Sequence, residues 1–251
     1  MNKLITYSSK TLLLLTIFCI AMGFFETAVV VYLQELYYPE GFQFPIKIMA
    51  PNIFVVELIR ETSTIVMLCV IGIICGKNFH ERFAYFIYCF AVWDIFYYVG
   101  LKVFLDWPPS LLTWDILFFI PIVWVGPVLA PVICSVTMIL LAGCIISAER
   151  RVQSAERKEQ KDYSVTIKLR EWVLLFSGSF IILFTFMWDY TKLLIKEGFT
   201  TNFQQAVAQY VPTDYNWYLF AIGEILLLFA IALFWRRTIF QKTRLNRKFA
   251  K

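Results

Sequence analysis

Three ionisable side chains share one helical face within a long apolar stretch near residue 60. Glu57, Arg60 and Glu61 stand at positions i, i+3 and i+4, so in a helix the arginine can pair with both carboxylates. Ionisable groups inside an apolar segment of membrane-spanning length are costly and are usually functional. We therefore predict that these three residues belong to a catalytic site.

A further carboxylate, Asp94, has two phenols close to it in the sequence. Tyr97 and Tyr98 follow at i+3 and i+4, which places them beside the carboxylate on a helix. A positioned carboxylic acid can serve as a general acid. Our hypothesis is that Asp94 donates a proton, that Glu57 or Glu61 is its partner, and that the two tyrosines orient the substrate.

Four more residues are candidates for substrate binding. Glu26 and Glu224 lie in apolar stretches near the two ends of the chain, Trp93 precedes Asp94, and Trp217 shares a helical face with Glu224. Aromatic faces attract cations, so they suit a reaction with a cationic intermediate. A structural alternative stays open: the polar groups can simply hydrogen-bond between helices, at about 0.6 kcal/mol each, and Trp217 can belong to an interfacial aromatic belt.

Several kinds of chemistry lack the residues that they need. His80 is the only histidine, and haem, copper and catalytic zinc sites depend heavily on histidine. The chain has no P-loop and no GxGxxG motif. Its six cysteines lie in apolar stretches without CxxC spacing, as expected for buried thiols. We predict no cofactor and no metal site, although carboxylates leave a hard cation such as calcium open.

The composition places these residues in a membrane. The chain has 251 residues, of which 60% are hydrophobic and 16% are charged, and its mean hydropathy is +0.68. Soluble domains are about 45–50% apolar and about 25% charged. The net charge of +5 comes from basic residues in a few short stretches between apolar blocks, so we expect no nucleic-acid partner.

Six apolar segments are long enough to cross a bilayer, which takes about 20 residues as a helix. The first follows Lys3 and Lys10 but continues without a small-residue cleavage site, so we expect a retained helix rather than a signal peptide. We predict an all-α, polytopic transmembrane bundle that forms one domain over residues 1–251. The expected helices are about 11–36, 53–75, 82–105, 118–147, 171–195 and 216–235.

The basic residues predict the orientation. Eighteen of the 23 Lys and Arg residues lie before the first helix, after the second, in the loop 148–170 or in the tail 236–251. Because positive charge marks the cytoplasmic side, the loop, the tail and both termini are expected there. The protein is then expected in a bacterial inner membrane. In this orientation all the intramembrane ionisable groups lie at the middle or outer level, which predicts one acidic cavity lined by Tyr and Trp.

The fourth apolar segment contains three prolines, Pro121, Pro127 and Pro131. Proline removes a backbone donor and kinks a helix. The apolar stretch is also too long for one straight crossing. We predict a kinked fourth helix, preceded by a short interfacial or re-entrant piece at about 110–120.

The middle of the chain carries a series of recognisable motifs. They are Arg82-Phe83-Ala84-Tyr85, Trp93-Asp94-Ile95-Phe96-Tyr97-Tyr98, Trp107-Pro108-Pro109-Ser110, Thr113-Trp114-Asp115-Ile116-Leu117 and Trp124-Val125-Gly126-Pro127. This region resembles uncharacterised bacterial multi-pass membrane proteins. The resemblance implies a membrane fold and implies no activity.

Three functions are compatible with an acidic cavity in the membrane. The first is acid catalysis on a lipidic or isoprenoid substrate. The second is a non-catalytic subunit of a larger membrane complex, whose polar residues serve assembly with partner subunits. The third is a proton or cation transporter, although ionisable groups are almost absent from the inner halves of the helices. In each case membrane lipids are expected partners, and the sequence leaves open whether the protein is an enzyme.

Overall fold

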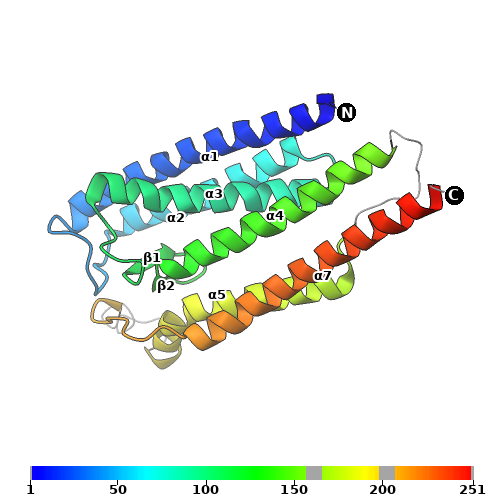
Figure 1. Ribbon diagram of the computed structural model, residues 1–251. Helices are drawn as coiled ribbons and strands as arrows, with labels where there is room; N and C mark the ends of the chain where they lie inside the picture. The colour runs from blue at the N-terminus through cyan, green and yellow to red at the C-terminus, as the bar shows by residue number, and fades with distance from the viewer. Residues whose placement is uncertain (1, 157–165, 198–206, 250–251) are drawn as a thin grey trace.

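The computed structural model describes residues 2–156, 166–197 and 207–249, and over these residues the chain forms six long helices and one two-stranded hairpin (Figure 1). Each helix contains an apolar stretch of 23 to 28 residues, long enough to cross a membrane. The predicted all-α bundle with six candidate spans is confirmed, and it indicates an integral membrane protein. The elements are α1 (Asn2–Tyr37), α2 (Pro51–Cys75), α3 (Phe79–Leu105), β1 (Trp114–Phe118), β2 (Trp124–Pro127), α4 (Leu129–Glu156), α5 (Leu169–Glu197) and α7 (Trp217–Phe249).

The basic segments are more helical than the hydropathy pattern predicts. Helix α4 continues to Glu156 and α5 begins at Leu169, so much of the expected loop 148–170 is helix. Helix α7 runs to Phe249, through most of the expected tail 236–251. Charged residues end an apolar segment, but they do not end a helix, because Lys, Arg and Glu are good helix formers.

The prediction of helix between residues 118 and 128 is wrong. Strands β1 and β2 pair there as an antiparallel hairpin, and α4 begins only at Leu129. Pro121 lies between the strands and Pro127 ends β2. Pro131 lies in the first turn of α4, where a backbone N–H has no helical partner in any case. The predicted kink is not confirmed, because none of the three prolines lies in the helix interior.

The six helices form two groups (Figure 1). Helix α3 is central to the first group and packs against α1, α2 and α4, whereas α5 and α7 pack mainly against each other and contact the first group through α4. Both chain ends lie at one end of the bundle, which we call the terminus end. The hairpin lies at the opposite end, the hairpin end. Which end faces the cytoplasm stays a prediction from the charge pattern.

The terminus half of the bundle is filled by the largest apolar cluster. Its buried members include Cys19 of α1, Leu68 of α2, Cys89 of α3, Ile145 of α4 and Phe234 of α7. All of them lie toward the terminus end of their helices. This half of the molecule is therefore densely packed, and it supports the polar residues of the other half.

A buried ion pair holds α5 and α7 together at the terminus end. The guanidinium of Arg237 donates hydrogen bonds to both carboxylate oxygens of Glu171, at 2.9 and 2.7 Å. Glu171 is fully buried, and it also accepts a hydrogen bond from the backbone N–H of Lys168 at 2.9 Å. Buried charges require such partners, so the pair fixes the start of α5 against α7.

Helices α5 and α7 also meet backbone to backbone further along. A Cβ atom at Gly178 would lie 2.8 Å from the carbonyl oxygen of Gly223, and one at Gly223 would lie 2.9 Å from the carbonyl oxygen of Gly178. Small residues permit this close approach in membrane helices, where van der Waals packing is a main source of association.

We predict that Gly178→Ala destabilises the protein by about 1–3 kcal/mol, because the added methyl group forces α5 and α7 apart. The matched control is Gly143→Ala in α4, where an added Cβ meets no atom within 4 Å. The control should be neutral or slightly stabilising, since Ala favours helix over Gly by about 0.5–1 kcal/mol. The thermal unfolding midpoint in mild detergent is the measurement. Equal shifts in both variants would contradict the proposed contact.

Candidate functional site

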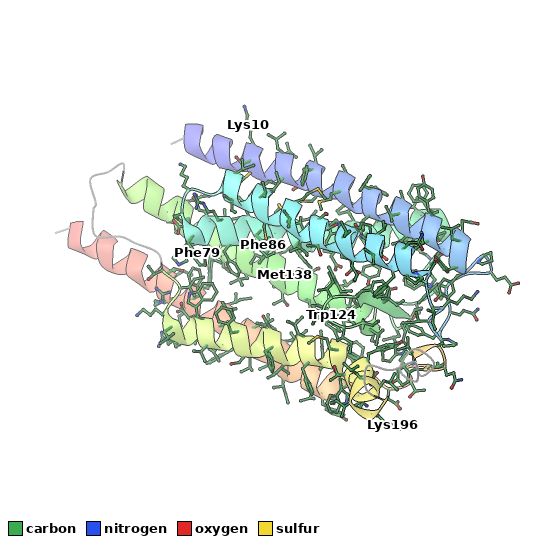
Figure 2. The ribbon with its side chains drawn as sticks, turned by 180° about the vertical axis from the view of Figure 1, so that it is seen from behind. Lys10, Phe79, Phe86, Trp124, Met138 and Lys196 are labelled. Carbon is green, nitrogen blue, oxygen red and sulfur yellow. The ribbon has the colours of Figure 1, made fainter. Side chains whose placement is uncertain are left out.

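A cavity of about 370 Å³ lies between the two helix groups in the hairpin half of the bundle. Its wall is formed by residues of all six helices and of the hairpin. In Figure 2, Trp124 of β2 marks its hairpin end and Met138 of α4 lies nearer the middle of the bundle. The volume falls within the range of about 300–1,000 Å³ that is usual for small-molecule sites.

Eight of the ten residues predicted from the sequence line this cavity. They are Glu26, Glu57, Arg60, Glu61, Trp93, Asp94, Tyr97 and Tyr98. Glu224 is buried but does not line the cavity; it accepts a hydrogen bond from Thr137 of α4 at 2.8 Å. Trp217 also lies outside it and packs edge-on against Tyr215 and Phe220. The two predicted residues of α7, Glu224 and Trp217, therefore lie outside the cavity.

Arg60 pairs with two carboxylates, but they are not the two that the spacing predicts. Its guanidinium forms ion pairs with Glu57, one turn away on α2, and with Glu26 of α1. The Nε–H donates to Glu57 Oε2 at 2.9 Å. Glu61 is not among its ion-pair partners. Spacing along one helix identified the first partner, whereas the second comes from a neighbouring helix that spacing cannot reveal.

Glu61 instead holds the hairpin. Both of its carboxylate oxygens accept the backbone N–H of Phe119, at 3.1 and 3.0 Å, in the segment that connects the two strands. Glu61 is buried. A buried backbone donor outside helix and strand needs an acceptor, and this carboxylate supplies it. The contact fixes the hairpin connection against α2.

Two further carboxylates of the cavity lining, Asp94 and Asp115, have hydrogen-bond donors of their own. Asp94 accepts a hydrogen bond from the hydroxyl of Ser135 in α4 at 2.8 Å. Asp115 of β1 accepts one from the phenol of Tyr98 at 3.0 Å and one from the backbone N–H of Ile116 at 2.8 Å. Tyr98 therefore orients the Asp115 carboxylate, which adds Asp115 to the site.

Asp115 was missed as a candidate because its place in the sequence suggests an interfacial residue. The available signal was the dipeptide Trp-Asp, which occurs at 93–94, 114–115 and 188–189; the aspartates of the first two line the cavity and that of the third does not. Burial raises the pKa of the Asp115 carboxyl to about 7, the hydrogen bonds from Tyr98 and Ile116 oppose the shift, and the nearby Asp94 carboxylate adds to it. This carboxyl therefore changes its protonation state close to neutral pH.

The cavity is formally acidic. Five carboxylates line it, and Arg60 is the one Lys or Arg residue among its lining residues. Arg60 already forms ion pairs with two of the five carboxylates, so it does not neutralise the other three. Closely spaced carboxylates at low dielectric cannot all be ionised, and protons or a positively charged group must offset part of the charge. The five are Glu26, Glu57, Glu61, Asp94 and Asp115.

The cavity changes character toward the middle of the bundle. Its lining there contains Phe90, Met138, Ile182 and Leu227, together with the hydroxyl group of Ser179. Nearer the hairpin, aromatic rings form a continuous row, with centroid distances of 6.4 Å from Trp93 to Phe118 and 5.4 Å from Phe118 to Trp124. The site therefore has an acidic pole and an apolar pole.

Comparison of the chain with protein-family models, with curated proteins and with solved structures finds no match. In the part of the chain that the structure describes, no three His, Cys, Asp or Glu side chains are grouped closely enough to hold a metal ion. Function has to be inferred from the chemistry of carboxylates, phenols and one guanidinium around an apolar cavity.

Removing the Arg60 charge should destabilise the protein strongly. Arg60→Gln leaves Glu26 and Glu57 as buried like charges, and losing one member of a buried pair costs roughly 3 kcal/mol. Adding Glu57→Gln to this variant should restore part of the loss, since it removes one uncompensated charge. Lys102→Gln is the control, because the Lys102–Asp106 pair is exposed and should not change the unfolding midpoint. Equal midpoints for the single and double variants would contradict the ion-pair assignment.

Asp115 should make stability depend on pH. Its folded pKa of about 7 lies above the ordinary value of 3.8, so between about pH 4 and pH 7 the folded state holds a proton that the unfolded chain has lost. Stability from this group is complete below that window and falls as the pH rises through it, by up to about 1.4 kcal/mol per pH unit.

The measurement is the unfolding midpoint of wild type, Asp115→Asn and the exposed control Asp214→Asn between pH 4.5 and 7.5. Asp115→Asn should flatten the decline that wild type shows, because the amide cannot ionise. Asp214→Asn should retain the wild-type slope. An unchanged slope in Asp115→Asn shows that the buried carboxyl does not titrate in this range.

Proposed function

We propose that this integral membrane protein binds an amphiphilic, lipid-like molecule in its cavity and acts on it by acid catalysis. The observation that carries the proposal is one cavity whose lining combines five carboxylates and two tyrosines with a group of apolar side chains. An amphiphile has the complementary division between its polar group and its chain. Van der Waals packing of the chain against the apolar side chains, which drives association within a bilayer, places the polar group against the carboxylates.

Asp94 and Asp115 are the proposed acid and base. Asp94, positioned by Ser135, donates a proton to the substrate, and Asp115, positioned by Tyr98, accepts a proton from it. One proton enters the substrate and one leaves, so the reaction class is a proton shift. A proton must then pass from Asp115 back to Asp94 to restore both groups, and no other co-reactant is needed. Asp115 takes the partner role that spacing assigned to Glu57 or Glu61, because both of these are held by other groups.

The other lining residues have supporting roles in this proposal. Tyr97 orients the substrate beside Asp94, and the faces of Trp93 and Phe118 stabilise positive charge that develops during protonation. Arg60 pairs with Glu26 and Glu57 and offsets one of their two negative charges. Because these carboxylates are held by the guanidinium, the proposal assigns the acid chemistry to the α3 side of the cavity.

The proposed location is a bacterial inner membrane with the terminus end in the cytoplasm. Both chain ends lie at that end of the bundle (Figure 1), as an even number of crossings requires. Eighteen of the 23 Lys and Arg residues occur in the segments assigned to it, which is the bias of cytoplasmic segments. The acidic cavity then lies in the outer half of the membrane.

A proton or cation transporter receives less support. Transport needs polar groups at both depths of the membrane. The buried carboxylates of the terminus half, Glu81, Glu149 and Glu171, do not line the cavity, and apolar side chains fill the space between. The other proposal is a non-catalytic subunit of a larger membrane complex. It predicts that a partner protein co-purifies with this chain.

We predict that the protein extracted in mild detergent carries a lipid-like molecule that Asp94→Asn releases or weakens. Native mass spectrometry measures the bound mass. The matched control is Asp189→Asn, which alters a carboxylate that pairs with Lys192 outside the cavity. The control should retain the ligand as wild type does, because only Asp94 touches the proposed binding space.

Two results would count against the proposal. Equal retention in both variants would show that the molecule does not depend on Asp94. A stoichiometric polypeptide that co-purifies with wild type, together with an unstable isolated chain and no small ligand, would favour the complex subunit instead.

A further inference from the structure

The cavity reaches the surface of the bundle at one residue of its lining. Among the lining residues, each of which lies in the described part of the chain, only Ser179 of α5 is exposed; the others are buried or half-buried. Ser179 lies within the apolar span Leu169–Lys196, and its neighbour Phe180 is 70% exposed. A residue that lines a cavity and is also exposed lies at the rim of that cavity. The cavity therefore opens beside Ser179, on a surface that faces lipid in an integral membrane protein.

The depth of this opening follows from helix geometry. Ten residues of the span, from Leu169 to Gly178, precede Ser179. With a rise of about 1.5 Å per residue, Ser179 lies about 15 Å from the start of the span. The hydrocarbon core of a bilayer is about 30 Å thick, so the inner edge of the opening lies close to the midplane. The molecules that surround the bundle at this depth are the hydrocarbon chains of lipids.

Helices α2 and α5 form the two sides of the opening. Helix α2 packs mainly against α3 and α5 mainly against α7, yet both α2 and α5 line the cavity. Ser179 and Leu183, at positions i and i+4, are the lining residues on the α5 side. In Figure 2 the labelled residues Phe86 of α3 and Met138 of α4 lie between α2 and α5. Helices α3 and α4 thus form the floor of the opening, and Met138 also lines the cavity.

Aromatic contacts limit the length of this lateral opening. Toward the terminus end, the ring centroid of Trp172 in α5 lies 5.4 Å from that of Phe83 in α3. Toward the hairpin end, Phe186 of α5 stacks on Trp124 of β2 with a centroid distance of 6.5 Å. Both contacts connect α5 to the first helix group. The opening therefore extends from Ser179 toward the hairpin and ends at Phe186.

A route from water at the hairpin end is covered by aromatic side chains. Tyr38, Phe42 and Trp107 line the cavity there, and all three are half-buried. The ring centroid of Phe42 lies 5.1 Å from that of Tyr38 and 6.0 Å from that of Trp107. The backbone N–H of Lys47 also donates to the phenol of Tyr38 at 2.6 Å, which holds this segment in place. The lateral opening is the less obstructed of the two routes.

The two poles of the cavity are arranged in the order of a lipid molecule. Asp115 of β1 and Glu57 near the start of α2 lie toward the hairpin, whereas Met138 and Leu227 line the part nearer the middle of the bundle. A lipid in the leaflet on the hairpin side likewise has its polar group near the surface and its chain toward the midplane. Such a lipid can move sideways into the cavity without turning over.

We propose that the cavity takes up its ligand from the bilayer, through the lateral opening between α2 and α5. The ligand is a membrane lipid of the leaflet on the hairpin side, and its hydrocarbon chain passes Ser179. The inference rests on the proposed function and adds to it the source of the substrate, which is the bilayer rather than the water at the hairpin end.

The test uses the full-length protein in liposomes and a small neutral photoprobe, trifluoromethyl(iodophenyl)diazirine, which dissolves in the bilayer core. Light expels N₂ from the probe, and the resulting carbene inserts into a nearby C–H or O–H bond. Peptide mass spectrometry then locates the label. We expect label on the cavity-lining Met138 as well as on the lipid-facing Phe180, whereas the fully buried Leu68 should stay unlabelled.

Four variants identify the route. Ser179→Trp and Leu183→Trp each place an indole in the opening, and each should lower the label on Met138 by about tenfold, because close-packed side chains leave no space for the probe. Phe180→Trp, on the lipid-facing surface one residue away, is the matched control. Met49→Trp places the same group in the lining at the hairpin end. Both should keep the wild-type label on Met138. Circular dichroism checks that every variant retains its helices.

The outcomes separate this inference from the proposed function. If Met138 stays unlabelled in folded wild-type protein, or if folded Ser179→Trp and Leu183→Trp keep its label, the lateral route is wrong. Loss of the label in Met49→Trp alone would indicate entry from the hairpin end and would also overturn the inference. The proposed function is judged separately, by the lipid that native mass spectrometry detects and by its dependence on Asp94, so it can stand when the route fails.

Discussion

Backbone hydrogen bonding at the hairpin is the constraint on which the rest of the structure depends. Non-helical backbone can lie among transmembrane helices only where each N–H and C=O finds a partner. The ladder between β1 and β2 satisfies part of this need, and the N–H groups of Val128 and Leu129 bond to the carbonyls of Thr113 and Leu111. The connection between the strands depends on Glu61 for the N–H of Phe119. The hairpin then supplies part of the cavity wall, including Asp115, Phe118 and Trp124.

The cavity carboxylates connect different elements, and this explains how so much acidity can be accommodated. Through Arg60, Glu26 joins α1 to α2, while Glu61 joins α2 to the hairpin. Asp94 joins α3 to α4, and Asp115 joins the hairpin back to α3 through the Tyr98 phenol. Glu26 and Glu57 share the Arg60 guanidinium, and Glu61, Asp94 and Asp115 each have a separate donor. The same groups that position the bundle thus form the wall of the site, so structure and proposed chemistry share residues.

Hydropathy and charge were sufficient to predict the six spans. The common depth of the ionisable residues predicted one acidic cavity, and eight of the ten candidate residues line the cavity, whereas Glu224 and Trp217 do not. The hairpin was not predictable by these means. Residues 110–128 are as apolar as a helix, and strands of four and five residues are too short to show a period. The partner of Arg60 on α1 and the role of Asp115 depend on which elements are neighbours. A single sequence shows which residues share one face of a helix, but it does not show which helices and strands pack against each other.

The packed terminus half has a kinetic consequence for anything that occupies the cavity. The apolar cluster around Leu68 and Ile145 and the Glu171–Arg237 pair lie in the terminus half, and none of these four residues lines the cavity. We therefore expect a molecule to enter and to leave the cavity in the hairpin half. Arrival of one molecule and departure of another then compete for the same part of the protein, so a reaction product is expected to inhibit binding of its own precursor.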